Sequence, residues 1–126
     1  MNNGLKGPLK TVQSARFLSS ERLKLKKDFQ DVYQFGKRFA TKHLIVYVKD
    51  GEQAQVQVAF VTGRKVGAAH HRNRIRRIMR EAYRKMKNEF QDGFRFIFIA
   101  KSQVDPWRFI DVQQEMSSIL NKISKG

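Results

Sequence analysis

Residues 70–87, HHRNRIRRIMREAYRKMK, carry eight arginine and lysine side chains and a single acidic residue, Glu81. A guanidinium group can bind two phosphate oxygens at once, so this composition is typical of a surface that binds a polyanion. An ordinary solvated helix would mix its charges, because i,i+4 pairs of opposite sign stabilise a helix. Three such pairs here are like-charged: Arg72–Arg76, Arg76–Arg80 and Arg80–Arg84. The pattern favours nucleic-acid binding over a solvated surface helix.

The same segment has an apolar stripe at helical spacing, which is expected to pack in a core. The stripe consists of Ile75, Ile78, Met79, Ala82, Tyr83 and Met86. The opposite side is expected to present Asn73, Arg76, Arg77, Arg80, Arg84 and Lys87 to solvent or to a partner. A membrane-surface helix needs its apolar side free to enter lipid. A helix-turn-helix DNA reader needs another helix just upstream, where this chain has the strand-like VAFVTG and then RKVGAA. We expect neither a membrane nor DNA as a partner.

Positive charge is concentrated in this part of the chain. The 126 residues have a net charge of +15, and residues 64–87 alone carry 10 basic residues and one acidic residue. Such a field attracts polyanions. A content of 40% hydrophobic residues with ten phenylalanines allows a real core, and the absence of cysteine excludes disulfides and thiolate chemistry. The longest apolar runs, LIVYV and FIFIA, are too short for a membrane span. A soluble, cytoplasmic protein is expected.

The arginine-rich segment needs other elements to position it, and the first is a short helix. Phe29, Val32 and Tyr33 stand at i, i+3 and i+4, which predicts a helix over residues 26–35. Gly36 follows where a left-handed C-terminal cap would lie. Residues 1–20 show no sustained periodicity and are interpreted as a flexible basic extension, with residues 21–126 forming a single nucleic-acid-binding domain.

Three segments have the composition of strands. Residues 43–51 and 55–63 are separated by a short DGEQ-containing gap, which predicts an antiparallel hairpin. In residues 55–63, Val56, Val58 and Phe60 fall on one face. Residues 94–101, FRFIFIAK, are apolar on both faces, as expected of an interior strand.

A final helix is predicted after Asp105, the expected N-cap, with Pro106 in its first position. Its apolar face is Phe109, Val112, Met116, Ile119, Leu120 and Ile123, which is expected to pack on the sheet. The order of helix, two strands, basic helix, strand and helix predicts an α+β sandwich.

No catalytic constellation is evident. His70 and His71 are adjacent, so they point about 100° apart on a helix and do not form a two-ligand metal face. The only other histidine is His43. Glu81 is expected to pair with Arg77, Arg84 or Lys85 rather than to act as a general base. We assign no catalytic residue and no metal ligand, although a nuclease that uses His70 or His71 with Glu81 stays an alternative.

Two stretches resemble a known family. GRKVGAAHHRNRIRRIMREAYR is similar to the Lys-x-Gly-x-Ala…Arg-Asn-Arg signature of the protein subunit of bacterial ribonuclease P, and RLKLKKDFQDVYQFGKR resembles the first helix of that family. The resemblance covers about residues 21–124. It implies a ribosomal-protein-S5-domain-2-like two-layer fold of order α-β-β-α-β-α, with room for one extra short strand and a left-handed strand–helix–strand crossover. Five positions before or in the helix depart from the family pattern: Gly63, Arg64, Ala68 and the His70–His71 pair.

The resemblance also implies a function. The protein would bind the catalytic RNA subunit of ribonuclease P and the single-stranded 5′ leader of precursor tRNA, and aid endonucleolytic removal of the leader. Catalysis would lie in the RNA, with magnesium expected for the RNA-catalysed reaction and no cofactor held by the protein. A general RNA chaperone or ribosome-associated protein is the alternative.

The expected RNA-binding residues are Arg64, Lys65, Arg72, Asn73, Arg74, Arg76, Arg77, Arg80 and Arg84. The family match also points to a leader-binding cleft formed by Phe29, Tyr33 and Tyr47. For these three aromatic residues, plain core packing is the alternative.

Overall fold

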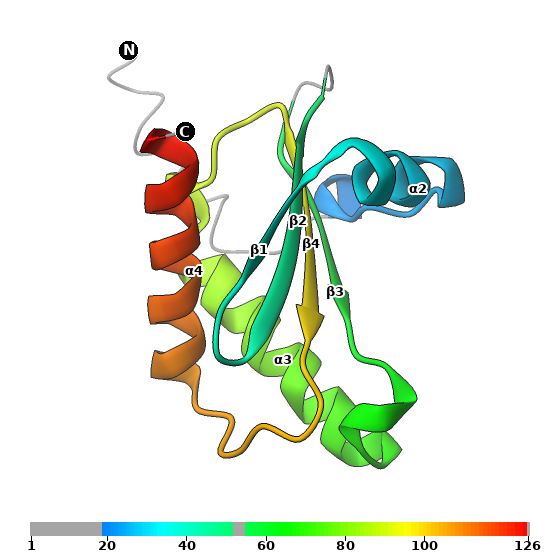
Figure 1. The fold of residues 1–126 in the computed structure, drawn as a ribbon, viewed down its shortest axis with the longest axis vertical. Helices are drawn as coiled ribbons and strands as arrows, with labels where there is room; N and C mark the ends of the chain where they lie inside the picture. Colours follow the sequence, from blue (N-terminus) through cyan, green and yellow to red (C-terminus); the bar gives the residue numbers. More distant parts are fainter. Residues whose placement is uncertain (1–18, 52–54, 126) are drawn as a thin grey trace.

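A four-stranded sheet forms the centre of the molecule (Figure 1). The computed structural model describes residues 19–51 and 55–125; residues 1–18, on which most of the predicted flexible extension falls, lie outside the described residues. The strands are β1 (Lys37–Ala40), β2 (Leu44–Asp50), β3 (Gln57–Val61) and β4 (Phe94–Ala100). Their order in the sheet is β1-β2-β4-β3, so β4 is an interior strand, as its two apolar faces predict.

The predicted hairpin between residues 43–51 and 55–63 is wrong. The strand β4 lies between β2 and β3: Tyr47 of β2 pairs with Ile97 in antiparallel register, and Ala59 of β3 pairs with Ile97 in parallel register. A strand that is apolar on both faces gains most from an interior position, which short loop length alone does not reveal. The hairpin partner of β2 is the short strand β1, which pairs through Phe39 and Val46.

One face of the sheet is sealed by two long helices, α3 (Ala69–Lys85) and α4 (Phe109–Lys125). The predicted apolar stripe of the basic helix is confirmed, since Ile75, Met79 and Tyr83 are fully buried. They pack with the row Phe96 and Phe98 of β4. The last helix contributes its predicted face, with Val112, Met116 and Ile119 buried in the same core.

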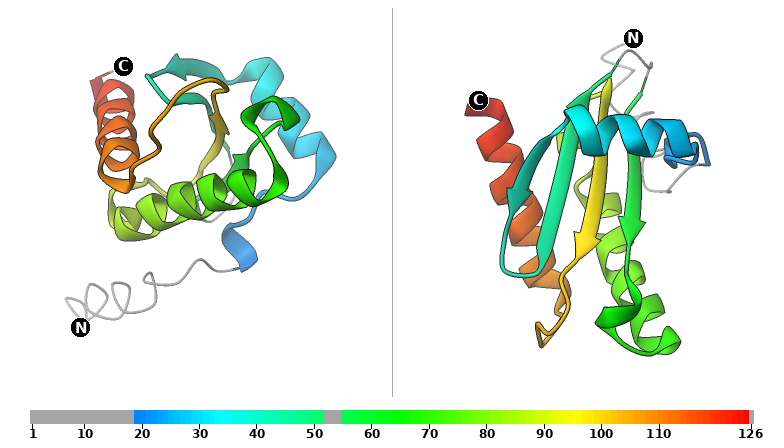
Figure 2. Two further views of the ribbon diagram at one scale, coloured as in Figure 1. Left: turned by 90° about the horizontal axis from the view of Figure 1, so that it is seen from below. Right: turned by 45° about the vertical axis from the view of Figure 1, so that its right-hand side comes forward.

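The other face is covered only in part, by α2 (Lys26–Phe35), whose bounds agree with the prediction. Seen from below, α2 and α3 lie on opposite sides of the strands (Figure 2). A small buried cluster of Leu23, Val32, Ala59 and Ile97 joins α2 to this face. None of the helices in the described part of the chain combines the length and apolar composition that a membrane crossing requires.

The connection from β3 through α3 to β4 is left-handed, the uncommon hand for parallel neighbours. In the view of Figure 1, α3 lies behind the sheet while the chain passes from β3 to β4. The α-β-β-α-β-α order is therefore confirmed, with β1 as the extra short strand.

Two predictions about helix ends are wrong: the conformation of Gly36 after α2 and the start of the last helix. Gly36 has φ −81°, so it is no left-handed cap. Glycine is required there by space, because a Cβ would lie 2.5 Å from the Val32 carbonyl oxygen and 2.8 Å from that of Val48. The last helix begins at Phe109, with Asp105 and Pro106 in the preceding loop. Buried Trp107 holds this loop against the core, an anchor that outweighs the local capping signal.

Candidate nucleic-acid interface

The start of α3 is set by the turn that precedes it, η2 (Arg64–Val66) and Gly67. Gly67 has φ +147°, a conformation that favours glycine. A Cβ on Gly67 would also lie 2.9 Å from the His71 ring. Gly63, where the chain departs from the family pattern, has extended backbone and open space around it, so a serine would fit equally well. The turn therefore depends on Gly67 and not on Gly63.

Three arginines near the start of α3 are bonded to the protein itself. Arg72 donates to the Gly67 carbonyl oxygen at 2.7 Å, and Arg74 donates to the Trp107 carbonyl oxygen at 3.2 Å. Arg76 donates to the Thr62 hydroxyl and to the side-chain oxygen of Asn73. Each guanidinium has five N–H donors, so these bonds orient the groups and leave donors for phosphate.

Four further basic residues of the predicted set face outward. Arg64, Lys65 and Arg77 are exposed, and Arg80 is half-buried. Within residues 19–51 and 55–125, no hydrogen bond or ion pair engages their side chains. The outer side of α3 and its preceding turn thus form a cationic surface, here called the arginine surface.

Arg84 differs from these residues because it is paired with Glu81. Its Nε and Nη2 atoms donate to the two carboxylate oxygens at 3.1 and 2.8 Å. The hydrogen bond from Arg84 lowers the pKa of the Glu81 carboxyl below its usual value. The predicted pairing of Glu81 with a neighbouring cation is confirmed, and Arg84 is the partner. Arg84 accordingly offers less unpaired charge than Arg77 or Arg80.

Lys87 does not lie on the outward side, contrary to the prediction. It is 8% exposed, and its Nζ lies 2.7 Å from Oε1 of Glu21, which is 4% exposed. The Tyr83 hydroxyl donates to Oε2 of Glu21 at 3.0 Å. Burial, followed by the charge of Glu21, raises the pKa of Tyr83. This buried cluster attaches η1 (Ser19–Glu21), just before α2, to the end of α3. Helical spacing cannot predict it, because η3 (Lys87–Glu89) has replaced the α-helix there.

The three predicted cleft aromatics come together between α2 and the sheet. The Phe29 and Tyr33 ring centroids are 6.4 Å apart, and the Tyr33 and Tyr47 rings meet edge to face at 5.0 Å. Phe29 and Tyr47 are half-buried against the small cluster, whereas Tyr33 is 40% exposed. Burial and the neighbouring Tyr47 raise the pKa of Tyr33. Packing in the core thus explains the placement of part of the Phe29 and Tyr47 side chains, but it explains little of the placement of the Tyr33 ring.

Charge pairs hold α2 at one end of this face. Asp31 pairs with Lys49 at 2.9 Å, and Asp28 lies 3.7 Å from Arg95. Arg95 also donates to the Gln57 side-chain oxygen at 2.9 Å. Both acidic groups of α2 therefore lie beside cations of the sheet.

The register leaves the rest of this face open. Two cross-strand rows follow the charged one, Tyr47–Ile97–Ala59 and then Ile45–Ile99–Val61. Every member of the last row is half-buried. The two rows and the three aromatic rings define what is here called the aromatic cleft.

A hollow of about 340 Å³ connects the aromatic cleft to the arginine surface across the edge of β3. Phe29 lines it from the cleft, and Arg76 and Arg80 line it from α3. Arg22 and Lys24 also line it, and neither was predicted as a site residue. They are placed by a backbone bond from Leu23 to Val58 at 2.9 Å. The sequence shows that they are basic, but only this pairing with β3 reveals what they face.

The side chains considered for acid–base or metal chemistry lie apart in the structure. His71 and Glu81 are ten residues apart on one helix, which separates them by roughly 15 Å along its axis. The third histidine, His43, is buried elsewhere, with its Nδ1 2.5 Å from Oε2 of Glu115. The described residues contain no group of three or more His, Cys, Asp and Glu side chains that could hold a metal ion.

A basic α+β sandwich with an arginine surface on one helix and an aromatic cleft beside it defines a nucleic-acid-binding protein. Comparison with known proteins specifies the family: residues 17–124 match the family model described as Ribonuclease P. The chain therefore belongs to the ribonuclease P protein family, whose members are subunits of an endoribonuclease that processes tRNA.

Individual relatives agree with this assignment. The chain is 32% identical to the ribonuclease P protein component of Clostridioides difficile, over 84% of this chain and 94% of that protein. It is 32% identical to the component of Syntrophus aciditrophicus, over 82% and 87% of the two chains. Among solved structures, the Staphylococcus aureus RNase P protein matches with a TM-score of 0.71 and 26% identity, covering 83% of this chain and 95% of that one. The Thermotoga maritima protein matches with a TM-score of 0.70 and 27% identity, covering 81% and 96%.

Proposed function

We propose that the chain binds the catalytic RNA subunit of ribonuclease P through the arginine surface and the single-stranded 5′ leader of precursor tRNA through the aromatic cleft. The observation that carries the proposal is the continuity of the two surfaces across the hollow lined by Phe29, Arg76 and Arg80. One RNA assembly can therefore contact both surfaces at once. Cytoplasmic location is part of the same proposal.

The arginine surface suits structured RNA because its donors are already oriented. Arg72, Arg74 and Arg76 are held by bonds to the protein, so less side-chain entropy is lost when phosphate binds. Arg77 and Arg80 add unpaired charge on the same helix. Neutralised phosphates release counterions, so binding should weaken steeply as salt increases.

The aromatic cleft suits an unpaired strand. Bases stack on aromatic side chains with about 1–3 kcal/mol each, largely independent of sequence. Tyr33 offers an exposed ring beside Tyr47, and Arg22 and Lys24 lie where the strand would leave the cleft toward α3. Precursor tRNA carries a single-stranded leader and mature tRNA has none. The cleft would therefore favour binding of the precursor.

In this proposal the protein positions RNA and the RNA carries out the cleavage. Glu81 is ion-paired with Arg84 and distant from the histidines along α3. Magnesium ions would be held by the RNA. The protein would act by placing the leader and by screening phosphate repulsion, which matters most when magnesium is scarce.

The test is reconstitution of the full-length protein with a bacterial ribonuclease P RNA at low magnesium. The protein should stimulate 5′ maturation of precursor tRNA, and the protein alone should not cut. Cleavage of precursor tRNA by RNA-free protein would contradict an RNA-based reaction, and its loss on substitution of His70, His71 and Glu81 would instead support a protein nuclease. Equal binding of precursor and mature tRNA would instead favour a general RNA chaperone.

A further inference from the structure

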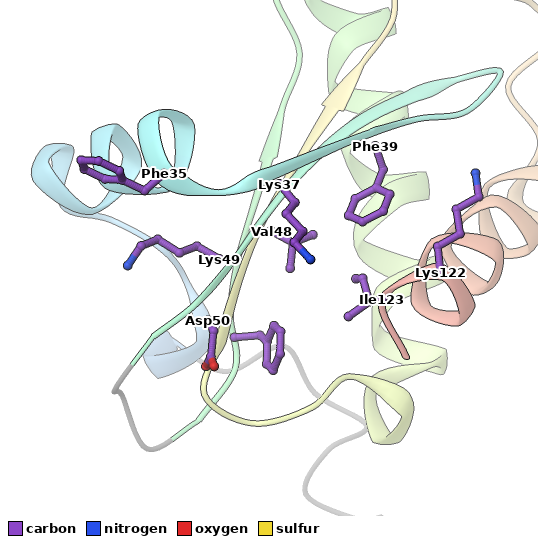
Figure 3. A pocket seen from close by; sticks show the side chains of 9 residues that line it. Phe35, Lys37, Phe39, Val48, Lys49, Asp50, Lys122 and Ile123 are labelled. Atoms are coloured by element: carbon purple, nitrogen blue, oxygen red, sulfur yellow. The ribbon is translucent and has the colours of Figure 1, made fainter. Parts of the chain in front are cut away.

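A cavity of about 580 Å³ lies outside both proposed surfaces (Figure 3). It is at the end of the sheet where β2 ends and β4 begins, since its lining includes the paired residues Asp50 and Phe94. The arginine surface starts at the other end, because α3 follows the end of β3, and β3 runs parallel to β4. The cavity lining is Phe35, Lys37, Phe39, Val48, Lys49, Asp50, Phe94, Lys122 and Ile123.

The floor of this cavity is apolar and aromatic. Phe39 of β1 lies opposite Ile123 in the last turn of α4, with Val48 of β2 to one side of them (Figure 3). Phe94 of β4 completes the floor, and both phenylalanines are half-buried, so part of each ring is accessible. A volume of this size lies within the range of about 300–1,000 Å³ that is typical of small-ligand sites.

The rim of the cavity is basic. Lys37 lies two residues before Phe39 on the same strand and so on the same face, where a sealed core would have an apolar side chain. Lys122 lies beside Ile123. Lys37 and Lys122 form no hydrogen bond or ion pair with the described residues. Lys49 is already paired with Asp31.

Two groups oppose an anion here, the Asp50 carboxylate and the carbonyl end of α4. Because Asp31 neutralises Lys49, the balance is set by Lys37 and Lys122 against the single Asp50 carboxylate, which leaves the rim net positive. The cavity thus combines aromatic faces with unpaired ammonium groups, which are the two features that bind a nucleotide in a single strand.

We propose that this cavity binds an unpaired nucleotide of RNA, with its base against Phe39 and Phe94 and its phosphate near Lys37 and Lys122. The proposal rests on the proposed function in that it requires an RNA partner, and it adds a third contact to the two surfaces above. Two RNA sources share this chemistry. One is a leader nucleotide upstream of the cleft, reached past Phe35, the last residue of α2, which is 66% exposed. The other is a nucleotide of the catalytic RNA.

The test compares two double variants of the full-length protein with equal changes in charge. Lys37→Glu with Lys122→Glu alters the cavity, and Lys42→Glu with Arg108→Glu alters exposed residues away from it. We expect the cavity variant to bind its RNA roughly 10- to 100-fold more weakly, with a salt slope smaller by about two. The control variant should lose less RNA affinity, because only the general effect of its reduced positive charge acts there. Equal losses in both variants would overturn the proposal.

Two binding measurements distinguish the RNA source. One is the affinity of protein for the catalytic RNA alone; the other is the affinity of the reconstituted enzyme for precursor tRNA with a short or a long leader. If the cavity variant has a lower affinity for the catalytic RNA alone, the nucleotide belongs to the catalytic RNA. If its affinity falls only for precursor tRNA with a long leader, the nucleotide belongs to the leader. A cavity variant that matches the unmodified protein in both measurements refutes the site.

Stacking is tested separately with Phe39→Leu, which keeps an apolar side chain but removes the ring. We expect binding roughly 5-fold or more weaker, with thermal unfolding monitored to confirm that the fold is retained. Unchanged binding by this variant would exclude a base against Phe39. If the unmodified protein stimulates maturation while the cavity variants behave like the control, the proposed function stands and the nucleotide site does not.

Discussion

The two faces of the sheet differ in how completely they are covered. On one face, α3 and α4 seal a continuous core that includes fully buried Ile75, Met79 and Tyr83. On the other face, α2 covers one end and leaves the row Ile45–Ile99–Val61 half-buried. The sealed face provides stability and holds the arginine helix in place. The open face keeps apolar and aromatic groups accessible, which stability alone would not favour.

The largest expected effect tests whether stability resides on the sealed face. Ile119→Ala, in the buried core of α4, should lower the free energy of unfolding by about 2–5 kcal/mol. Ile99→Ala, on the open face, should lower it by less than half as much, although alanine is disfavoured in a strand and favoured in a helix. Urea unfolding measures both. Equal losses would mean that the open face is as important for stability as the core.

A second prediction concerns the buried ion pair that attaches the segment before α2 to α3. Lys87→Ala should destabilise the protein by about 3 kcal/mol, because it leaves the Glu21 carboxylate buried without its cation. The double variant Glu21→Gln with Lys87→Met should recover much of that loss, since no buried charge is left uncompensated. Urea unfolding again measures the effect. No recovery in the double variant would show that packing, rather than the charge, accounts for the loss.

A third prediction separates the two surfaces by function. Arg77→Ala should weaken binding of the catalytic RNA, and Tyr33→Ala should reduce discrimination for the leader by about 1–3 kcal/mol. Both residues are substantially exposed, so neither change should unfold the protein. Arg84→Ala is the matched control for Arg77→Ala, because the Arg84 guanidinium is already paired with Glu81. Binding assays with catalytic RNA, precursor tRNA and mature tRNA measure both effects. The assignment of the surfaces would be wrong if Arg77→Ala mainly reduced leader discrimination, or if Tyr33→Ala mainly weakened binding of the catalytic RNA.

The smallest effect is a pH dependence from Tyr83. Its pKa is raised in the folded state above the usual value of 10.0, so the stabilisation is complete below that pH and is lost as the pH rises above it. Each pH unit above about 10 should remove up to about 1.4 kcal/mol. The Tyr83→Phe variant should be less stable at neutral pH, but its free energy of unfolding should decline less steeply between pH values of about 9 and 11. Parallel curves for the two proteins would count against the role of the Tyr83 hydroxyl.

Local periodicity predicted the elements better than their partners. The bounds of α2 and the buried stripe of α3 follow from i, i+3 and i+4 spacing, which depends only on helix geometry. The pairing of β2 with β3 was wrong, because strand partners depend on burial across the whole sheet. The α4 start was wrong for a similar reason, since Trp107 packing overrides the Asp105–Pro106 signal.

The candidate site shows the same division. Arginine content and spacing indicated a nucleic-acid surface, and Glu81 was expected to pair with a neighbour, which is Arg84. Arg22 and Lys24 were missed, because their proximity to Arg76 and Arg80 arises from a backbone bond to β3. Lys87 was placed on the wrong side, because the helical period was extended past the end of α3.

By itself, the sequence determined the charge, its concentration in one amphipathic helix, the family resemblance and the apolar faces that make a core. These properties depend on residue type and on spacing within one element. Only the tertiary structure decided that β4 separates β2 from β3, that Glu21 joins Lys87, and that a hollow connects the aromatic cleft to the arginine surface. These contacts join residues far apart in the chain, and such contacts depend on how the whole chain buries its apolar surface.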